Sequence, residues 1–307
     1  MPAMSDAHPP AAGFVAPSGD GPRRLRELLA GGETVLAPGV YDALGARVVE
    51  EAGFTAVYMT GFGTAASMLG RPDVGLVTMN EMVDNASRIV RATSLPLIAD
   101  ADTGYGNPIN VIRTVQEYER AGVAGIHIED QVSPKRCGHM EGKQVIPAAD
   151  MVAKVRAAVE ARRCEDFVLI ARTDAVAVEG VRGAIERAQR YRDAGADVLF
   201  VEAPRNEEEI ELVGSELAGT PLLFNWAQGG KTPPVPYDRL RQLGFRIVIF
   251  PLITLLGATQ AMRRALAEIR HAGPPVPIVD GVNAFDEFLD FVGLPEIREL
   301  ELRFTSE

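Results

Sequence analysis

The sequence is poor in the residues on which disulfide-rich and zinc-binding proteins depend. Among its 307 residues are two cysteines, Cys137 and Cys164, which lie far apart, and four scattered histidines. This pattern fits neither a disulfide framework nor a CxxC metal site, and no two histidines have the spacing of a zinc site. The low cysteine count predicts a reducing, cytoplasmic location.

Basic charge is also in short supply. The chain has 31 Lys and Arg against 42 Asp and Glu, and its formal net charge is −11 at pH 7. Nucleic acids and anionic membranes are bound through basic surfaces, so we expect neither as a partner. The longest apolar run, Ile247–Ala258, is too short to cross a bilayer and contains Pro251. No basic residue precedes Arg23, so a signal-peptide n-region is not expected.

What the chain does contain is a regular alternation of short apolar runs and longer amphipathic stretches. The predicted strands are Val35–Pro38, Ala56–Thr60, Leu97–Asp100, Gly125–Glu129, Phe167–Arg172, Val198–Glu202, Pro221–Asn225 and Arg246–Phe250. The predicted helices between them include Asn80–Thr93, Val111–Ala121, Asp150–Arg163, Val181–Ala194 and Glu207–Leu217. Strands that are apolar on both faces are typical of a parallel sheet covered by helices. Eight such units predict an α/β fold, a closed (β/α)₈ TIM barrel, with a doubly wound sheet as the alternative.

The barrel units do not account for the whole chain. Residues 1–22 are rich in Pro, Gly and Ala and are predicted to form a disordered N-terminal tail. Residues 23–272 form the predicted barrel, which ends with a helix over Leu255–His271. Residues 273–307 are predicted to form a C-terminal helical arm with helices over Ala284–Val292 and Pro295–Arg303. Because a barrel does not need these helices, we expect them to pack on a neighbouring subunit.

Five consecutive predicted strands end in polar residues. These residues are Asp100 with Asp102, Glu129, Arg172, Glu202 and Asn225. A single acidic residue at a strand end is often a helix N-cap, but capping does not readily explain five strands in a row. The carboxyl ends of barrel strands surround the active site of TIM-barrel enzymes, so this pattern predicts a catalytic site there.

Two of these acidic residues are placed to bind a metal ion. Asp100 and Asp102 are two positions apart, so both side chains point to one face of an extended strand. Adjacent carboxylates raise each other's pKa unless a cation lies between them. Glu129 adds a third oxygen donor from the next strand. Few carboxylates with room for water are typical of Mg²⁺, with Mn²⁺ as an alternative.

A basic loop follows the fourth predicted strand. It contains Lys135, Arg136, Cys137, Gly138 and His139. The loop could be a solvated basic segment with an incidental cysteine. At the mouth of a barrel, however, two fixed positive charges and an imidazole would stabilise the thiolate of Cys137. Such a thiol can donate and recover a proton near neutral pH.

Two glycine-containing loops follow other strands. Thr60-Gly61-Phe62-Gly63 lacks the dinucleotide-binding fingerprint, but its backbone N–H groups could hold a carboxylate. The segment 229–232, which ends in Thr232, lacks the spacing of a P-loop. We interpret it as a second anion-holding loop.

Together these motifs resemble the lyase branch of the isocitrate lyase/phosphoenolpyruvate mutase superfamily, from about Arg23 to the C-terminus. The motifs that carry the resemblance are Tyr41-Asp42-Ala43-Leu44, Thr60-Gly61-Phe62-Gly63, Leu69-Gly70-Arg71-Pro72-Asp73, Asp100-Ala-Asp102-Thr-Gly-Tyr-Gly-Asn107, Ile128-Glu129-Asp130-Gln131, Lys135-Arg-Cys-Gly-His139 and Ile170-Ala-Arg-Thr-Asp174. The resemblance implies a (β/α)₈ barrel whose last helix is exchanged between subunits. It also implies a homotetramer, a dimer of dimers.

The resemblance further implies roles for individual residues. Asp100, Asp102 and Glu129 would hold Mg²⁺, with Asp73 reaching it through water. Arg172 would bind the keto-acid half of the substrate, whose carboxylate contacts the loop that begins at Thr60. Gly61, Phe62 and Gly63 would complete the loop that holds this carboxylate. Lys135 to His139 would form a mobile gating loop in which Cys137 is the acid/base. Glu202 and Asn225 would form polar walls of the site.

The predicted activity is a Mg²⁺-dependent carbon–carbon lyase. Its substrate would be a 2-hydroxy di- or tricarboxylate of the 2,3-dimethylmalate or 2-methylisocitrate type, cleaved to a keto acid such as pyruvate and a carboxylate. The base stays open between Tyr41 and a metal-bound water. The alternatives on the same platform are oxaloacetate hydrolysis or decarboxylation, and carboxyvinyl-carboxyphosphonate phosphorylmutase chemistry. A non-catalytic binding barrel and a Schiff-base aldolase are disfavoured, since the catalytic groups are present and no strand ends in lysine.

Overall fold

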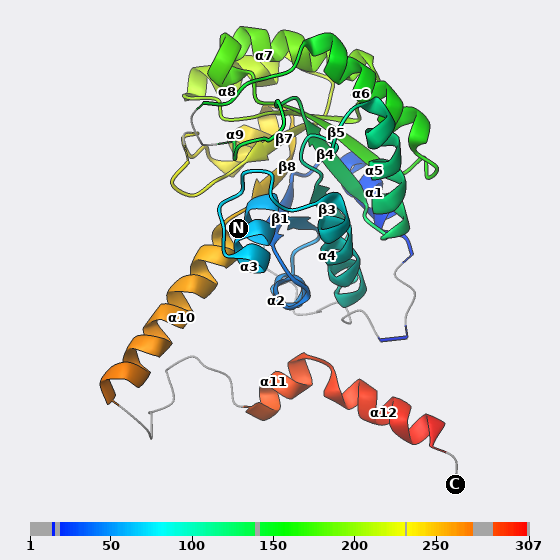
Figure 1. Cartoon of the computed structure of the whole chain (residues 1–307), viewed down its shortest axis with the longest axis vertical. Helices are drawn as coiled ribbons and strands as arrows, with labels where there is room; N and C mark the ends of the chain where they lie inside the picture. The colour runs from blue at the N-terminus through cyan, green and yellow to red at the C-terminus, as the bar shows by residue number, and fades with distance from the viewer. Residues whose placement is uncertain (1–13, 16–18, 139–141, 231, 273–284, 306–307) are drawn as a thin grey trace.

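The computed structural model describes residues 14–15, 19–138, 142–230, 232–272 and 285–305 (Figure 1). Its eight strands are β1 (Val35–Val40), β2 (Val57–Met59), β3 (Leu97–Asp100), β4 (Gly125–Glu129), β5 (Val168–Thr173), β6 (Val198–Val201), β7 (Leu222–Asn225) and β8 (Phe245–Phe250). They pair in parallel in chain order, and β8 pairs with β1, which closes the barrel. The predicted (β/α)₈ TIM barrel is therefore confirmed, and the doubly wound alternative is wrong.

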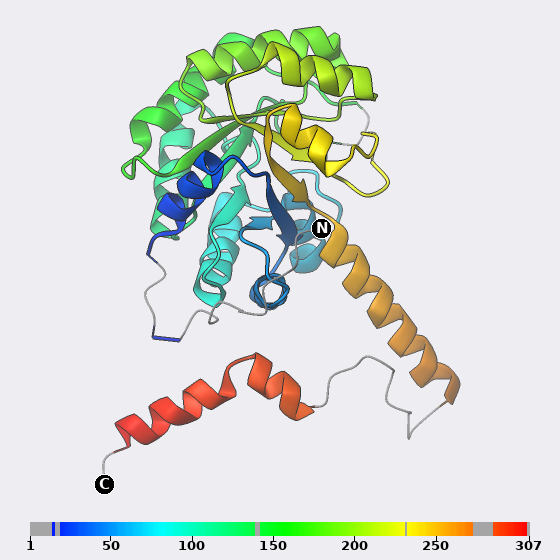
Figure 2. The ribbon, with the colours of Figure 1, turned by 180° about the vertical axis from the view of Figure 1, so that it is seen from behind.

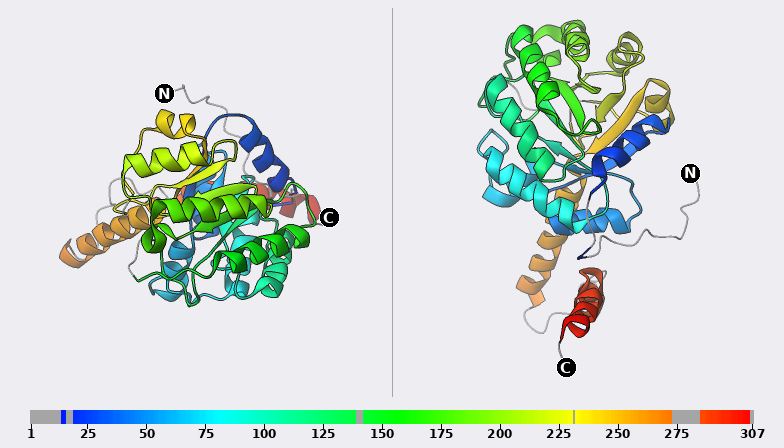
Figure 3. Two further views of the ribbon diagram at one scale, coloured as in Figure 1. Left: turned by 90° about the horizontal axis from the view of Figure 1, so that it is seen from above. Right: turned by 90° about the vertical axis from the view of Figure 1, so that its right-hand side faces the viewer.

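Helices surround the strands and continue beyond them. They are α1 (Gly21–Ala30), α2 (Ala43–Glu51), α3 (Gly61–Leu69), α4 (Met79–Ala92), α5 (Pro108–Arg120), α6 (Ala148–Ala161), α7 (Val176–Asp193), α8 (Glu207–Glu216), α9 (Tyr237–Gln242), α10 (Ile253–Ala272), α11 (Phe285–Phe291) and α12 (Leu294–Phe304). Figure 3 shows the helices of the barrel as a ring around the sheet, seen from above and from one side.

The barrel has two apolar layers, because successive strand residues point to opposite faces. On β6, Val198 and Phe200 pack inside the barrel, whereas Leu199 and Val201 pack against the outer helices. The same alternation on β5 points Ile170 inward. Arg172 and Glu202, two positions after Ile170 and Phe200, therefore also point inward, at the carboxyl ends of their strands.

The first helix begins earlier than the predicted boundary between tail and barrel. Residues 1–13 and 16–18 lie outside the described part of the chain, so their disorder stays a prediction. Gly21 and Pro22, which we placed in the tail, instead form the first turn of α1. Pro22 suits this position because its fixed φ angle matches the first turn of a helix, where its missing N–H is not needed. Leu25 of this helix is fully buried.

The C-terminal helices leave the barrel. Figures 1 and 2 show α10 extending away from the strands, while α11 and α12 lie beyond the lower side of the barrel. Arg47 of α2 donates to the carbonyl oxygen of Phe291 at 2.7 Å, and its guanidinium lies over the Phe291 ring. Of the described helices, none is long and apolar enough to cross a membrane.

Candidate active site

A small cavity opens at the carboxyl ends of the strands. Ten of the predicted site residues line it: Thr60, Phe62, Asp73, Asp100, Lys135, Cys137, Gly138, Arg172, Glu202 and Asn225. The cavity is small, about 40 Å³, and Cys137 and Gly138 form part of its wall. A Cβ atom added to Gly138 would collide with the ends of the side chains of Glu202 and Arg172, so a larger residue would displace these two groups.

A buried lysine lies among the predicted metal-binding carboxylates. The ammonium group of Lys135 contacts the carboxylate of Asp73 and lies 2.8 Å from Oδ1 of Asp102. That oxygen of Asp102 is buried, and the ammonium of Lys135 is its ion-pair partner. Asp100 is held differently, because its two oxygens accept from the backbone N–H groups of Asp102 at 2.9 Å and Gly61 at 3.2 Å. Asp100 is thus fixed by the backbone, whereas Asp102 is held by a side-chain cation.

The protonation equilibria show an excess of negative charge in this region. Burial raises the pKa of Asp102 to about 6, and the neighbouring Asp100 adds to the shift while Lys135 opposes it. Burial also raises the pKa of Glu129 well above its ordinary value, although Arg172 opposes the shift. The pKa of Lys135 is raised well above its ordinary value, because the carboxylates outweigh the effect of burial. A divalent cation would relieve this imbalance.

These donors fit Mg²⁺ with few direct protein ligands. Within the described residues, no three His, Cys, Asp or Glu side chains are close enough to hold one ion together. Asp73 and Asp100 line the cavity, whereas Asp102 and Glu129 do not. Mg²⁺ commonly keeps several waters and takes only one or two carboxylates, so an ion near Asp102 would reach the other carboxylates through water.

Arg172 provides a fixed positive charge in the cavity wall. Its Nε and Nη2 atoms donate to the two carboxylate oxygens of Asp174 at 2.9 and 3.1 Å. Its Nε atom also lies 3.2 Å from Oε2 of Glu129, and its guanidinium lies over the ring of Phe200. Burial would raise the pKa of Asp174, but Arg172 and Lys143 lower it well below its ordinary value. Asp174 therefore stays ionised and keeps the guanidinium oriented.

The loop around Cys137 differs in part from our expectation. Cys137 is half-buried and lines the cavity. The ammonium of Lys135 contacts Asp73 and Asp102, because these carboxylates offer a buried cation its partners, and Lys135 lines the same cavity as Cys137. Arg136 is exposed and does not line the cavity, and His139 lies outside the described residues.

The Thr60-Gly61-Phe62-Gly63 motif is the first turn of α3 rather than an open loop. The hydroxyl oxygen of Thr60 caps the helix by accepting from the N–H of Gly63 at 3.2 Å. The N–H of Gly61 donates to Asp100. Both amides therefore already have acceptors within the chain, and their role in holding the substrate carboxylate stays a prediction. Thr60 and Phe62 line the cavity as side chains.

Two further predicted residues lie away from the cavity lining. Tyr41 follows β1, and its carbonyl oxygen accepts from the side chain of Asn85 at 2.9 Å. Burial raises the pKa of the Tyr41 phenol, which makes it a poorer base near neutral pH. Thr232 is half-buried and does not line the cavity, and Lys231 of the same segment lies outside the described residues.

The structure adds a tyrosine and a histidine that we did not predict as site residues. The hydroxyl of Tyr58 lines the cavity and lies 2.8 Å from Nε2 of His127, which in turn lies 3.8 Å from Asp100. Burial lowers the pKa of His127 to about 4, so the ring is neutral near pH 7. Tyr58 lies on β2, two positions before Thr60, and alternate residues of a strand point to the same face. This spacing was the sequence signal that could have identified Tyr58 as a site residue.

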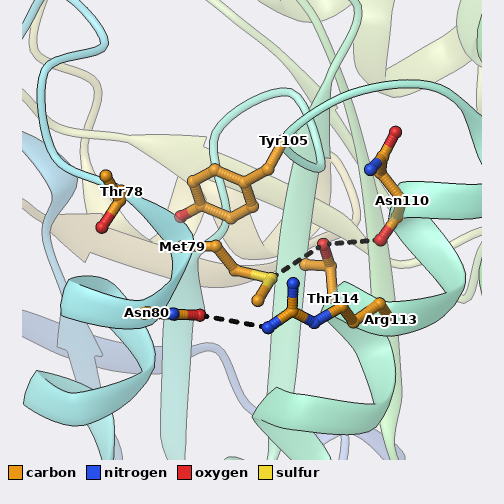
Figure 4. A pocket seen from close by; sticks show the side chains of 7 residues that line it. All are labelled: Thr78, Met79, Asn80, Tyr105, Asn110, Arg113 and Thr114. Carbon is orange, nitrogen blue, oxygen red and sulfur yellow. Dashed lines mark hydrogen bonds between the residues drawn. The ribbon is translucent and has the colours of Figure 1, made fainter.

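A second hollow lies beside the loop that follows β3 (Figure 4). It measures about 200 Å³ and lies between the first turns of α4 and α5, with Tyr105 forming one wall. Arg113 lies across it and donates to Asn80 at 3.4 Å. None of the predicted site residues lines this hollow. The cavity at the strand ends is therefore the candidate active site.

The comparisons with known proteins agree with this geometry. Residues 25–270 match the family model described as phosphoenolpyruvate phosphomutase. The chain is 46% identical over 283 residues to 2,3-dimethylmalate lyase of Eubacterium barkeri, which covers 92% of this chain and 98% of that protein. It is 46% identical over 285 residues to a 2-methylisocitrate lyase of Aeropyrum pernix, covering 92% and 91% of the two chains.

Solved structures show the same relationship. A 2,3-dimethylmalate lyase, described as a PEP mutase/isocitrate lyase superfamily member, superposes with a TM-score of 0.87 at 43% identity, covering 92% of this chain and 95% of the other. An oxaloacetate acetylhydrolase bound to 3,3-difluorooxalacetate gives a TM-score of 0.87 at 42% identity, covering 95% and 97%. The resemblance inferred from the sequence motifs is confirmed.

Proposed function

We propose that the protein is a Mg²⁺-dependent carbon–carbon lyase. The chain belongs to the phosphoenolpyruvate phosphomutase family. The substrate is a 2-hydroxy di- or tricarboxylate of the 2,3-dimethylmalate or 2-methylisocitrate type. One observation carries the proposal: Cys137, the fixed guanidinium of Arg172 and the carboxylates of Asp73 and Asp100 line one cavity. A proton donor, an anion site and a metal site are what cleavage between C2 and C3 of such a substrate requires.

The residues of the chain divide this work between them. Asp102, with Asp100, Glu129 and Asp73 acting through water, would hold Mg²⁺. When bound, the ion supplies Lewis-acid polarisation of the C2 hydroxyl and its neighbouring carboxylate. Arg172 binds the carboxylate of the keto acid that forms, because Asp174 keeps its guanidinium oriented and charged.

The two proton transfers take place on different groups. A base removes the C2 hydroxyl proton as the C2–C3 bond breaks. Tyr58 and His127 do not serve as this base, because burial raises the pKa of the Tyr58 phenol well above its ordinary value and lowers the pKa of His127 to about 4. As the C2–C3 bond breaks, its electron pair remains on C3, and the thiol of Cys137 protonates that carbon. For 2,3-dimethylmalate the products are pyruvate and propanoate, which together contain all of the atoms of the substrate.

A substrate panel tests this proposal. We expect release of pyruvate from 2,3-dimethylmalate or 2-methylisocitrate in the presence of Mg²⁺, and its loss when EDTA removes the ion. Pyruvate can be followed by a coupled assay and the second product by NMR. Turnover of neither branched substrate at millimolar concentration would contradict the proposal.

The same panel tests a second candidate function, oxaloacetate hydrolysis. The observation that favours it is the likeness to the oxaloacetate acetylhydrolase structure over 95% of this chain. Acetate and oxalate released from oxaloacetate, without cleavage of the branched substrates, would support this alternative. Phosphonopyruvate completes the panel, because it tests the phosphonate chemistry of the wider family.

We also propose that the active form is a homotetramer, a dimer of dimers. Helix α10 extends away from the barrel (Figure 2). Its exposed apolar side chains include Met262, Leu266 and Ile269, whose spacing places them on one face of the helix, and Ile253 and Leu256 on the opposite face. Apolar helix faces of this kind need a partner surface, and a second copy of the chain is the partner we propose.

A charge placed on one of these faces tests the assembly. We expect Leu266→Glu to convert the tetramer to smaller species, because Leu266 is 64% exposed in the single chain and would be buried in the assembly. Light scattering after size-exclusion chromatography measures the mass. The control is Arg263→Glu, which changes the charge of an exposed residue of the same helix without removing an apolar side chain. A wild-type protein that elutes as a monomer would contradict the proposed assembly.

We propose that the protein is located in the cytoplasm. Its binding partner would be a small carboxylate, and neither nucleic acid nor a membrane is expected as a partner. The net charge of −11 supports the absence of polyanionic partners. Cys137 and Cys164 form no disulfide, which suits a reducing compartment.

A further inference from the structure

The short peptide segment Arg136–Gly138, which carries Cys137, is held by side chains from both sides. On one side, the amide of Gln131 pairs with the backbone of Arg136: its Nε2 donates to the carbonyl oxygen at 2.8 Å, and its Oε1 accepts from the N–H at 3.0 Å. On the other side, the ammonium of Lys143 donates to the carbonyl oxygen of Gly138 at 2.5 Å. We call Gln131 and Lys143 the clamp of this segment.

Each clamp residue is also bonded to a group of the active site. Gln131 donates to Oε1 of Glu129 at 2.9 Å, and Lys143 donates to Oδ1 of Asp174 at 2.8 Å. Asp174 is the carboxylate that orients Arg172. The position of the Cys137 backbone is thereby tied to the carboxylate group on one side and to the arginine on the other.

The clamp bonds are made away from water. Gln131 is 2% exposed and Lys143 is 8% exposed, so water competes little for their partners. The need to neutralise Asp174 does not by itself explain why Lys143 lies beside it, because Asp174 already accepts two hydrogen bonds from Arg172. Packing alone does not explain Gln131, since both ends of its amide bond the backbone of a single residue. Both side chains fix the backbone on either side of Cys137.

We propose that Gln131 and Lys143 are positioning residues that set where the Cys137 thiol lies relative to Arg172 and the metal-binding carboxylates. The inference rests on the proposed function, in which Cys137 gives a proton to the substrate carbanion. Proton transfer requires donor and acceptor within hydrogen-bond reach. A displacement of about 1 Å can lower turnover by about 100-fold.

The test uses two clamp variants and one matched control in the full-length enzyme loaded with Mg²⁺. Lys143→Met and Gln131→Leu remove the clamp bonds while keeping much of the side-chain volume. The control is Arg162→Met, which removes a partly buried cation paired with Asp197 near the amino ends of the strands. All are made in a Cys164→Ser background, so that alkylation by iodoacetamide reports on Cys137 alone.

We expect both clamp variants to lower kcat by about 100-fold with KM changed by less than about threefold. We expect them to raise the alkylation rate of the half-buried Cys137 by about tenfold, because the segment opens more often. Lys143→Arg, which keeps the charge and a donor, should recover part of kcat. The Arg162→Met control should lower thermal stability and leave the alkylation rate of Cys137 unchanged.

Alkylation needs no turnover, so it separates failure of this inference from failure of the proposed function. An unchanged alkylation rate in both folded clamp variants would overturn the positioning role, whatever the substrate proves to be. A normal kcat together with faster alkylation would also overturn it, because the thiol position would then not limit the reaction. If Lys143→Met does not fold, Gln131→Leu decides alone, since it leaves the ion pairs of Asp174 intact.

Discussion

Replacing Cys137 by serine should lower kcat by about 10²–10⁴-fold, the range that one positioned acid contributes. A hydroxyl is a much weaker acid than a thiol, so it cannot protonate the carbanion as it forms. Binding of pyruvate to the Mg²⁺-loaded variant should persist, because the keto acid is held by Arg172, whose partner Asp174 is untouched. Steady-state kinetics and calorimetric titration with pyruvate measure the two effects.

The natural control is Cys164→Ser. Cys164 is exposed, and its backbone N–H bonds to Glu119 away from the cavity, so this variant should keep the turnover of the wild type. If Cys137→Ser retained near-normal kcat, the thiol would not be the acid. A variant that lost both turnover and pyruvate binding would point to a collapse of the cavity rather than to the loss of a proton donor.

Replacing Asp102 by asparagine should abolish activity and yet stabilise the metal-free protein at neutral pH. The activity is lost because the carboxylate that pairs with Lys135, and that we assign to Mg²⁺, becomes a neutral amide. We expect kcat to fall by at least about 10³-fold, and added Mg²⁺ to stop raising the melting temperature. Activity assays and thermal unfolding with and without Mg²⁺ measure these effects.

The stability effect has a defined sign and pH window. Burial raises the pKa of Asp102 from 3.8 to about 6, so the folded protein binds a proton that the unfolded chain has released between these values. Wild-type stability therefore falls, relative to Asp102→Asn, as the pH rises from about 4 to 6, and the difference stays constant above. A shift of this size corresponds to about 1–3 kcal/mol. Unfolding of both metal-free proteins at pH 4, 6 and 8 checks it; a difference independent of pH would contradict the assignment.

Much of the fold could be predicted from the sequence because its signals are local. The apolar runs that became β4 and β6 are long enough to be recognised, and the intervening amphipathic stretches have helical spacing. The polar residues at the strand ends followed from the same reasoning, since parallel barrel strands all end on one side. Glu129 and Arg172, for example, are neighbours in the β4–β5 register.

The partners of these residues could not be predicted in the same way. Lys143 lies in a segment that is neither helix nor strand, so no periodicity indicated that its ammonium would reach Asp174. Tyr58 lies within an apolar strand and looks like an ordinary core residue. The N–H of Gly61 appeared available because sequence spacing does not show that Asp100 accepts from it. Each omission concerns which groups pair across the barrel, a property of three-dimensional packing.

The contact of Lys135 with Asp73 and Asp102 has a consequence for how the protein acquires its ion. The chain already contains a counter-ion for these carboxylates, so it does not depend on a metal to balance their charge during folding. Loading of the proposed Mg²⁺ site would then be an exchange of one cation for another, in which the ion must outcompete a tethered ammonium group. The free energy of that contact would lower the affinity for Mg²⁺, and occupancy would respond to the supply of the ion.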